Sequence, residues 1–404
     1  MEEKKTLNVI QDFPSLSRKI DGNNITYLDS AATSLKPKSV IDSICSYYSE
    51  NSSNIHRGKH YLSEEASNVY EECRIKVAQL IESFSDEVIF TKNTTESINL
   101  VAHGLNFNKE TDNVIICTDS HHSNYIPWIA AANAHIVKLN SDGVIDINHF
   151  KELIISKKPK LVAISHCSNV TGIYAPIDKL LKLAKEAGAL TFLDVAQSIP
   201  HRKINVKKLD VDFIAFSPHK MLGPTGIGIL YGKRNILEKL NPLILGGGTV
   251  DWVENGSYVL RKAPHKFEAG TPHIAGAYGF MAAIDYINKI GYPQIEAHDN
   301  ELSKVLYSEA IKRDYIDIMV KNLDYDRSAI LSFGINNNNN LGDIARALSD
   351  SYGLMCRSGH LCAQPLVDEL TSGEVIRVSA YIYNTKQEII NFFNALDTIY
   401  QIYG

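Results

Sequence analysis

The sequence lacks an apolar run long enough to cross a membrane. No stretch approaches the roughly 18 apolar residues that a membrane helix needs, and the first residues, MEEKKTLNVIQDF, contain no apolar region of the kind that a signal peptide requires. The chain also has no cluster of basic residues, and its formal net charge is −5, so it offers no electrostatic footprint for nucleic acid. These absences predict a cytoplasmic protein whose partners are small molecules and other proteins.

Cysteine is scarce and irregularly spaced. The six cysteines include no CxxC pair, which predicts reduced thiols rather than a disulfide framework. A zinc site built from Cys356, His360 and Cys362 fails on the spacing of its ligands. The sequence therefore predicts no metal site.

What the sequence does contain, from about residue 86 onward, is an alternation of short apolar runs with helical patterns. Helical patterns lie between several of the runs, for example at 177–188, where Gly188 can end a helix. Strands that alternate with helices predict an α/β fold with a mainly parallel, seven-stranded sheet flanked by helices. The seven runs are 87–90, 113–117, 134–139, 160–165, 189–194, 212–217 and 226–231.

A chain of 404 residues exceeds the roughly 250–300 residues at which a single core stops growing, so we expect two domains. The pattern changes after about residue 272, where a long helix at 275–290 is followed by helices mixed with short strands. We predict a large domain at 27–271 and a smaller α+β domain at 272–404, with an N-terminal segment at 1–26.

Lys220 stands between two apolar runs, where a buried ammonium group is costly unless it has a partner or a covalent role. A lysine amine can form a Schiff base with an aldehyde cofactor, and a carboxylate such as Asp194 can hold a pyridinium nitrogen protonated. Ligands bind beyond the carboxyl ends of the strands in such sheets, so we expect both side chains at one site. A lysine with its head in water and a turn aspartate are the alternatives.

Other strand ends carry side chains that suit a phosphate and a planar ring. Thr94 and Thr95 open a predicted helix, whose backbone N–H groups and hydroxyls form an anion site, although simple N-capping explains them equally well. Ser217 and His219 adjoin the lysine and add two candidate phosphate donors. His121 follows another strand, where an imidazole can stack on a planar cofactor, and a loop histidine without such a role is the alternative.

Two residues near the C-terminus are candidates for substrate chemistry. Cys362 lies in the turn-prone segment CRSGHLCAQPL, the kind of exposed loop where a thiolate reacts, and an unreactive loop thiol is the alternative. Arg377 lies in an apolar strand, and its guanidinium group suits a substrate carboxylate, while a surface ion pair is the alternative.

An ordered set of motifs runs along nearly the whole chain: YLDSAATSLKP (27–37), NIHRGKHYLS (54–63), TTESINLVA (94–102), HHSNYIPW (121–128), HCSNVTG (166–172), LDVAQS (193–198), SPHKMLGPTGIGILYG (217–232), FEAGTP (267–272) and RSGHLCAQPL (357–366). Together these motifs resemble the SufS-type (group II) cysteine desulfurases, which belong to the class V aminotransferase-like, fold type I pyridoxal-phosphate enzymes. The chain departs from the usual pattern at Pro218, Leu361 and His273, which affects loop shape rather than the reacting groups.

The resemblance implies pyridoxal 5′-phosphate as the cofactor and a role for each matching residue. Lys220 would carry the cofactor, Asp194 would face the ring nitrogen, Gln197 would donate to the ring hydroxyl, His121 would stack on the ring, and Thr94 or Thr95, Ser217 and His219 would hold the phosphate. Thr271 would reach the phosphate of a neighbouring subunit, which implies a homodimer. Asn169 and Arg377, with Arg357 close by, would position the substrate carboxylate, and Cys362 would accept sulfur.

The implied activity is cysteine desulfuration. The enzyme would convert L-cysteine to L-alanine, hold the sulfur as a persulfide on Cys362, and pass it to a SufE- or SufU-like acceptor protein for iron–sulfur cluster assembly. Two alternatives stay open: a selenocysteine lyase or cysteine sulfinate desulfinase of the same fold, and a partner-binding protein of this fold without catalysis.

Overall fold

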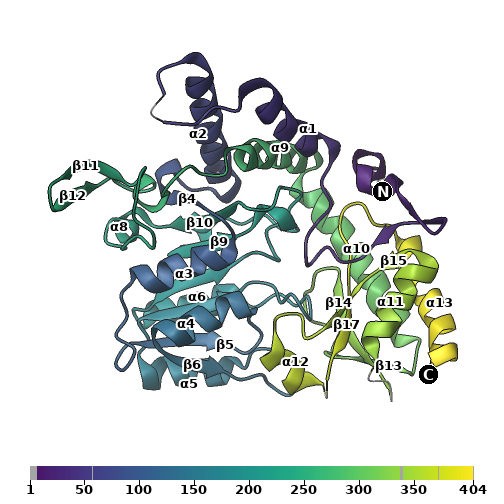
Figure 1. The fold of residues 1–404 in the computed structure, drawn as a ribbon. Coiled ribbons are helices and arrows are strands. Elements are labelled where there is room, and N and C mark those ends of the chain that lie inside the picture. The colour runs from purple at the N-terminus through teal and green to yellow at the C-terminus, as the bar shows by residue number, and fades with distance from the viewer. Residues whose placement is uncertain (1–6, 57, 337–339, 372, 404) are drawn as a thin grey trace.

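The computed structural model describes residues 7–56, 58–336, 340–371 and 373–403. A seven-stranded sheet in the blue and teal part of the chain and a four-stranded sheet in the green and yellow part occupy different regions of the molecule (Figure 1). No helix within these residues has the length and apolar character needed to cross a membrane.

The seven-stranded sheet confirms the predicted α/β class, because all seven apolar runs form its strands. Its neighbours pair in parallel except β10, which runs antiparallel to both β4 and β9. In spatial order the strands are β4 (Val88–Thr91), β10 (Gly228–Gly232), β9 (Phe213–Phe216), β8 (Leu190–Asp194), β7 (Leu161–Ser165), β5 (Asn113–Cys117) and β6 (Asn133–Val137). The carboxyl ends of six strands therefore meet at one edge.

Both faces of this sheet are covered, so its strands are apolar throughout. Side chains alternate along a strand: Val162 and Ile164 pack into one core, and Leu161 and Ala163 pack into the other. The helices on the first face are α1 (Lys38–Ser46), α2 (Tyr61–Ile81), α5 (Ile147–Lys157), α6 (Ile177–Glu186) and α9 (Ile274–Ile290), and those on the second are α3 (Thr94–Gly104), α4 (Ile126–Ala131) and α8 (Arg234–Leu237). The short helix α7 (Val206–Leu209) leads into β9.

Helix α6 shows how local sequence sets these elements. Leu180, Leu181 and Ala184 recur on one side and are buried, while the opposite side is polar, as expected of a helix that covers a sheet. The helix ends just before Gly188, whose φ of 75° is the left-handed conformation that commonly terminates helices. The predicted helical pattern at 177–188 is confirmed.

The four-stranded sheet is antiparallel and has its own apolar core. Its order is β13 (Ile316–Ile318), β14 (Ile330–Ile335), β17 (Val375–Ser379) and β16 (Arg357–Gly359). Packed around it are α10 (Tyr292–Ile311), α11 (Leu341–Tyr352) and α13 (Lys386–Tyr403), while α12 (Gln364–Leu370) contributes to a separate small cluster. The buried side chains of α9 belong to the core of the larger sheet, and the boundary at 271/272 stays a prediction.

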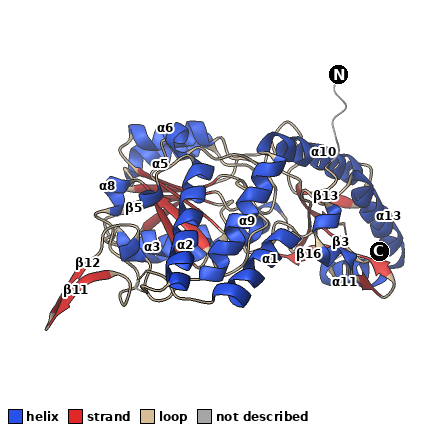
Figure 2. Cartoon of the chain, turned by 90° about the horizontal axis from the view of Figure 1, so that it is seen from above, coloured by secondary structure: helices blue, strands red, loops and turns tan. Residues whose placement is uncertain are grey.

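Three two-stranded pieces complete the fold. They are β1 (Lys19–Ile20) with β2 (Asn23–Asn24), β3 (Thr26–Tyr27) with β15 (Leu354–Met355), and the hairpin of β11 (Val250–Glu254) and β12 (Ser257–Leu260). The pairing of β3 with β15 joins the N-terminal segment to the strand that directly precedes β16 in the chain. The hairpin projects away from the rest of the ribbon in both views (Figures 1 and 2).

Candidate active site

The strand ends of the large sheet meet two strands of the small sheet at a cavity of about 430 Å³. Every residue that the sequence predicted for the site lines this cavity except Thr271: they are Thr94, Thr95, His121, Asn169, Asp194, Gln197, Ser217, His219, Lys220, Arg357, Cys362 and Arg377. They come from the ends of β4, β5, β7, β8 and β9, from β16 and β17, and from the turn before α12. Segments more than 250 residues apart thus share one enclosure.

Lys220 and Asp194 approach the cavity from neighbouring strands. Lys220 ends the short helix η6 (Pro218–Lys220) after β9, and Asp194 ends β8. Burial lowers the pKa of Lys220 to about 8, an effect that Asp194 opposes and Arg377 reinforces. Burial likewise raises the pKa of Asp194, although the N–H of Ala196 donates to its Oδ1 at 2.9 Å. The Asp194 carboxylate therefore accepts a hydrogen bond within the turn that follows β8. It also lines the same cavity as the half-buried Lys220.

His121 is held as a neutral imidazole. Its Nδ1 accepts the backbone N–H of Ser123 at 3.1 Å and lies 3.1 Å from the Ser123 hydroxyl. Burial, reinforced by the charge of Lys220, lowers the pKa of His121 to about 3. The ring is thus uncharged at neutral pH, and a flat neutral ring on the cavity wall suits contact with another planar ring.

The N-terminus of α3 also lines the cavity. The Thr94 hydroxyl lies 2.7 Å from the Ser217 hydroxyl, which also accepts the N–H of Thr94 at 2.8 Å. Simple N-capping by the threonines is wrong, because the cap is Asn93, whose side chain accepts the N–H of Glu96. The N–H groups of Thr94 and Glu96 are thus used within the protein, and the two threonine hydroxyls with the N–H of Thr95 are the groups that would meet an anion in the cavity.

The backbone next to Lys220 is clamped by the segment before α1. The carbonyl of His219 accepts four donors: the N–H and hydroxyl of Ser34 at 2.9 and 3.1 Å, the Thr33 hydroxyl at 3.0 Å and Lys36 Nζ at 2.9 Å. Burial lowers the pKa of Lys36 to about 8. The His219 ring, 3.2 Å from the Thr33 hydroxyl, has its pKa lowered to about 4, again mainly by burial. Sequence reasoning gave Lys36 no role, although it lies within one of the motifs.

Arg357 and Arg377 lie directly opposite each other on β16 and β17, an arrangement that like charges destabilise. Asp29 resolves it by accepting from both: Arg357 Nη2 donates to Asp29 Oδ2 at 2.8 Å and Arg377 Nη2 donates to Asp29 Oδ1 at 3.0 Å. Arg377 is only 3% exposed, so the surface ion pair considered from the sequence is wrong. Its Nε is buried without a hydrogen-bond partner.

Asn169 and Gln197 both use their amide groups on the protein itself. Asn169 Nδ2 donates to the carbonyl of Leu361 at 2.8 Å, and the backbone carbonyl of Asn169 accepts from Arg377 Nη1 at 2.9 Å. Gln197 Nε2 donates to the carbonyl of Ala31 at 2.7 Å. Asn169 thus joins the arginine to the turn that carries Cys362, which is exposed and also borders the cavity.

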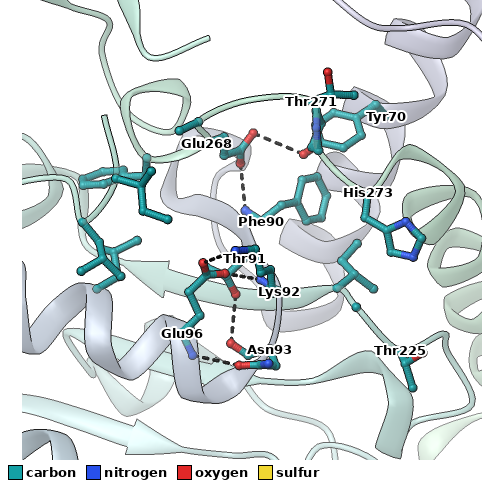
Figure 3. A pocket seen from close by; sticks show the side chains of 18 of the residues that line it. Tyr70, Phe90, Thr91, Lys92, Asn93, Glu96, Thr225, Glu268, Thr271 and His273 are labelled. Carbon is teal, nitrogen blue, oxygen red and sulfur yellow. Dashed lines mark hydrogen bonds and ion pairs between the residues drawn. The ribbon is translucent and has the colours of Figure 1, made fainter. Parts of the chain in front are cut away.

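Thr271 lines a second cavity of about 630 Å³, which shares Asn93 and His219 with the first. Figure 3 shows Thr271 in this second cavity, together with Tyr70, Glu268 and His273. Asn54 Nδ2 donates to the Thr271 hydroxyl at 3.4 Å. Within one chain, therefore, Thr271 is the predicted site residue that the fold does not bring to the first cavity.

Among the described residues, His56, Glu71 and His265 form the one group of three or more metal-ligand side chains whose donors lie within 4.8 Å of one another. Glu71 is already engaged, because Arg74 Nε and Nη2 donate to its two oxygens at 2.8 and 3.3 Å. These residues lie apart from those that line the first cavity.

Three further residues of the site escaped sequence reasoning. Asp29 and Lys36 lie inside the first motif, and Ser123 follows the paired histidines with its hydroxyl 2.7 Å from that of Thr95. Motif membership was the available signal. The two arginines that Asp29 contacts lie 328 and 348 residues further along the chain. No local sequence pattern indicates such pairs.

Comparison with known families decides the ancestry of this architecture. The model of the aminotransferase class-V family matches residues 26–392. The chain belongs to the class V aminotransferases. The match covers both sheets and every residue named above as lining the first cavity, and the predicted class V aminotransferase-like family is confirmed.

Individual class V relatives are similar over nearly their whole length. The chain is 40% identical to a protein named cysteine desulfurase from Haloferax volcanii, over 97% of this chain and 96% of the relative. It is 41% identical to a probable cysteine desulfurase from Halalkalibacterium halodurans, over 97% of each. Among solved structures, the apo cysteine desulfurase from Thermococcus onnurineus NA1 is 35% identical and aligns over 99% of both chains with a TM-score of 0.90.

Proposed function

We propose that the chain is a pyridoxal 5′-phosphate-dependent cysteine desulfurase of the SufS type. It converts L-cysteine to L-alanine and holds the sulfur as a persulfide on Cys362. The observation that carries the proposal is that Lys220 and Cys362 line the same cavity of about 430 Å³, so an amine that can hold an aldehyde cofactor and a thiol that can take up sulfur share one enclosure. Full-length relatives named cysteine desulfurase support it.

The residues around the cavity fit the cofactor chemically. Thr94, Thr95 and the N-terminus of α3 would hold its phosphate, Asp194 would face the ring nitrogen, and the neutral ring of His121 would lie against its ring. Ser217, His219 and Gln197 would supply further hydrogen bonds. When bound, pyridoxal phosphate supplies an electrophilic aldehyde and a ring that accepts electrons released at the substrate's α carbon.

The buried arginine pair would hold the substrate carboxylate. Arg377 is fixed by Asp29 and by the Asn169 carbonyl, yet its Nε keeps a free N–H group. A buried donor without a partner is costly, and a carboxylate that enters the cavity would satisfy it. Arg357 is half exposed at the same wall and would add a second positive charge.

Lys220 would move the proton. Its pKa of about 8 leaves a substantial fraction of the amine neutral near physiological pH, and a neutral Nζ can accept a proton from the substrate's α carbon. An ordinary exposed lysine, with a pKa near 10.4, would be almost fully protonated.

Cys362 would take the sulfur. As its thiolate attacks the substrate sulfur, a sulfur–sulfur bond forms and the substrate's carbon–sulfur bond breaks. The electron pair stays on the carbon skeleton, which takes up a proton and leaves as L-alanine. The exposed position of Cys362 then allows the persulfide to be handed to another protein.

Three variants test the proposal. Cys362→Ala should lose cysteine-dependent alanine release in the presence of a thiol acceptor, and Lys220→Ala should lose it completely. Cys45→Ala removes the other exposed cysteine and should leave the rate unchanged. Full turnover by Cys362→Ala contradicts the persulfide role, and comparison with selenocysteine and cysteine sulfinate as substrates separates the desulfurase from the related lyases.

The active unit would be a homodimer in which Thr271 completes the partner's phosphate site. Thr271 lies outside its own first cavity, and the hairpin β11–β12 exposes Trp252, Val253, Tyr258 and Val259, an apolar surface of the kind that subunit contacts cover. Light scattering should give twice the chain mass. Thr271→Ala should weaken cofactor retention, although it changes no residue that lines the first cavity of its own subunit.

The persulfide would pass to a small SufE- or SufU-like acceptor in the cytoplasm, for iron–sulfur cluster assembly. Six unpaired cysteines support a reducing compartment. The large domain, 27–271, would carry the cofactor, and the small domain, 272–404, would carry Cys362 and both arginines. Transfer of radiolabelled sulfur to each purified acceptor type tests the partner.

A further inference from the structure

The turn that carries Cys362 has a strained backbone. Leu361 and Cys362 have φ values of 55° and 54°, so two successive residues that bear a Cβ adopt the left-handed conformation. Single non-glycine residues adopt it rarely, and neither side chain can hydrogen-bond to its own backbone as asparagine does. Such a conformation persists where surrounding contacts impose it. The contacts that hold this turn therefore decide where the thiol lies.

Three hydrogen bonds tie the turn to the end of the large sheet. Asn169 Nδ2 donates to the Leu361 carbonyl at 2.8 Å. His122 makes the other two: its backbone N–H donates to the Cys362 carbonyl at 2.8 Å, and its Nε2 accepts the backbone N–H of Gln364 at 3.3 Å. His122 thus holds the turn at the sulfur-bearing residue and two residues after it, while Asn169 holds it one residue before.

The same histidine adjoins the cofactor side of the cavity. It opens the short helix η5 (His122–Asn124), directly after His121, whose ring lines the cavity. A displacement of this helix would move the neighbouring imidazole and the Cys362 turn together. The mechanism above uses His121 and Cys362 but leaves His122 without a role.

We propose that His122 is the positioning residue of the Cys362 turn. Its Nε2 keeps the strained turn folded against the cavity, so that the thiol of Cys362 faces the substrate sulfur. The inference rests on the proposed function, since it concerns the geometry of sulfur uptake. An Nε2 that accepts a hydrogen bond requires a neutral ring with its proton on Nδ1. A substitution that removes this acceptor releases one of the three tethers of the turn.

The test compares three variants as holoenzymes. His122→Phe keeps a ring and removes the acceptor, His122→Gln keeps an acceptor, and His103→Phe changes an exposed histidine of α3. Two quantities are measured: the rate at which iodoacetamide alkylates Cys362, followed by mass spectrometry of its peptide, and kcat and KM for L-cysteine. The other two tethers, from the His122 N–H and from Asn169 Nδ2, remain in all variants, so changes of about three- to tenfold are expected rather than complete loss.

We expect His122→Phe to raise the alkylation rate and lower kcat at unchanged KM, with partial recovery in His122→Gln and no effect of His103→Phe. Parental alkylation and kcat in His122→Phe overturn the inference, and so does faster alkylation at parental kcat. If the Phe variant does not fold, His122→Ala against His122→Gln gives the same comparison. The proposed function fails separately, through full turnover of Cys362→Ala.

Discussion

Removing the carboxylate of Asp29 should be the most informative single change outside the reacting groups. Asp29→Asn keeps the shape of the side chain but leaves one oxygen to accept from both Arg357 and Arg377. Its new NH2 group faces the N–H groups of an arginine and cannot accept from them. Arg377 is 3% exposed and cannot turn to water, whereas Arg357 is 49% exposed. The loss should therefore come mainly from Arg377.

The magnitude follows from these burials. Removing one partner of a buried ion pair costs about 3–5 kcal/mol, while the half-exposed Arg357 adds less than about 1 kcal/mol. We take about 3 kcal/mol, because asparagine keeps one acceptor. At about 2.1 cal/mol/K per residue, the unfolding entropy of 404 residues is roughly 0.85 kcal/mol/K, so Tm should fall by about 3–4 °C.

Differential scanning calorimetry and steady-state kinetics check both consequences. KM for L-cysteine should rise about tenfold, equivalent to about 1.4 kcal/mol, because Arg377 loses one of its two fixed contacts. Asp42→Asn is the matched control, since Asp42 pairs with Lys38 at an exposed site and its loss should be worth less than about 1 kcal/mol. An Asp29→Asn protein with the parental Tm and KM would refute the reasoning.

Three further predictions concern other buried ionisable groups. Glu268→Gln should lower Tm by about 3 °C in calorimetry, because it removes the carboxylate that Arg74 contacts at 2.6 Å in the interior; an unchanged Tm contradicts this. Burial lowers the pKa of His166 to about 4; the unfolded chain therefore binds a proton that the folded chain excludes, stability falls as pH drops from about 6.5 to 4, and His166→Gln should show a smaller fall of Tm between pH 7 and 5. Lys36→Met should speed cofactor release, measured by dialysis and absorbance, because the His219 carbonyl loses one of its four donors, whereas Lys38→Met, at an exposed site, should not.

Much of the site was predictable because its chemistry is local to strand ends. The apolar runs before Asp194 and Lys220 predict strands, and the polar residues that follow must leave the sheet at its carboxyl edge. The glycine and polar residues around Cys362 predict a turn. Each of these inferences needs only a few neighbouring residues, and all of them are reproduced by the fold.

The sequence by itself determined the α/β class, the seven strands and the kinds of group at their ends, since periodicity and turn chemistry act over short distances. Tertiary structure alone decided that Arg357 faces Arg377 across two strands, that Asp29 lies between them, and that His122 holds the Cys362 turn. Such contacts depend on strand register and on loops that meet after hundreds of residues. Register is set by the packing of whole faces, which no local pattern of residues records.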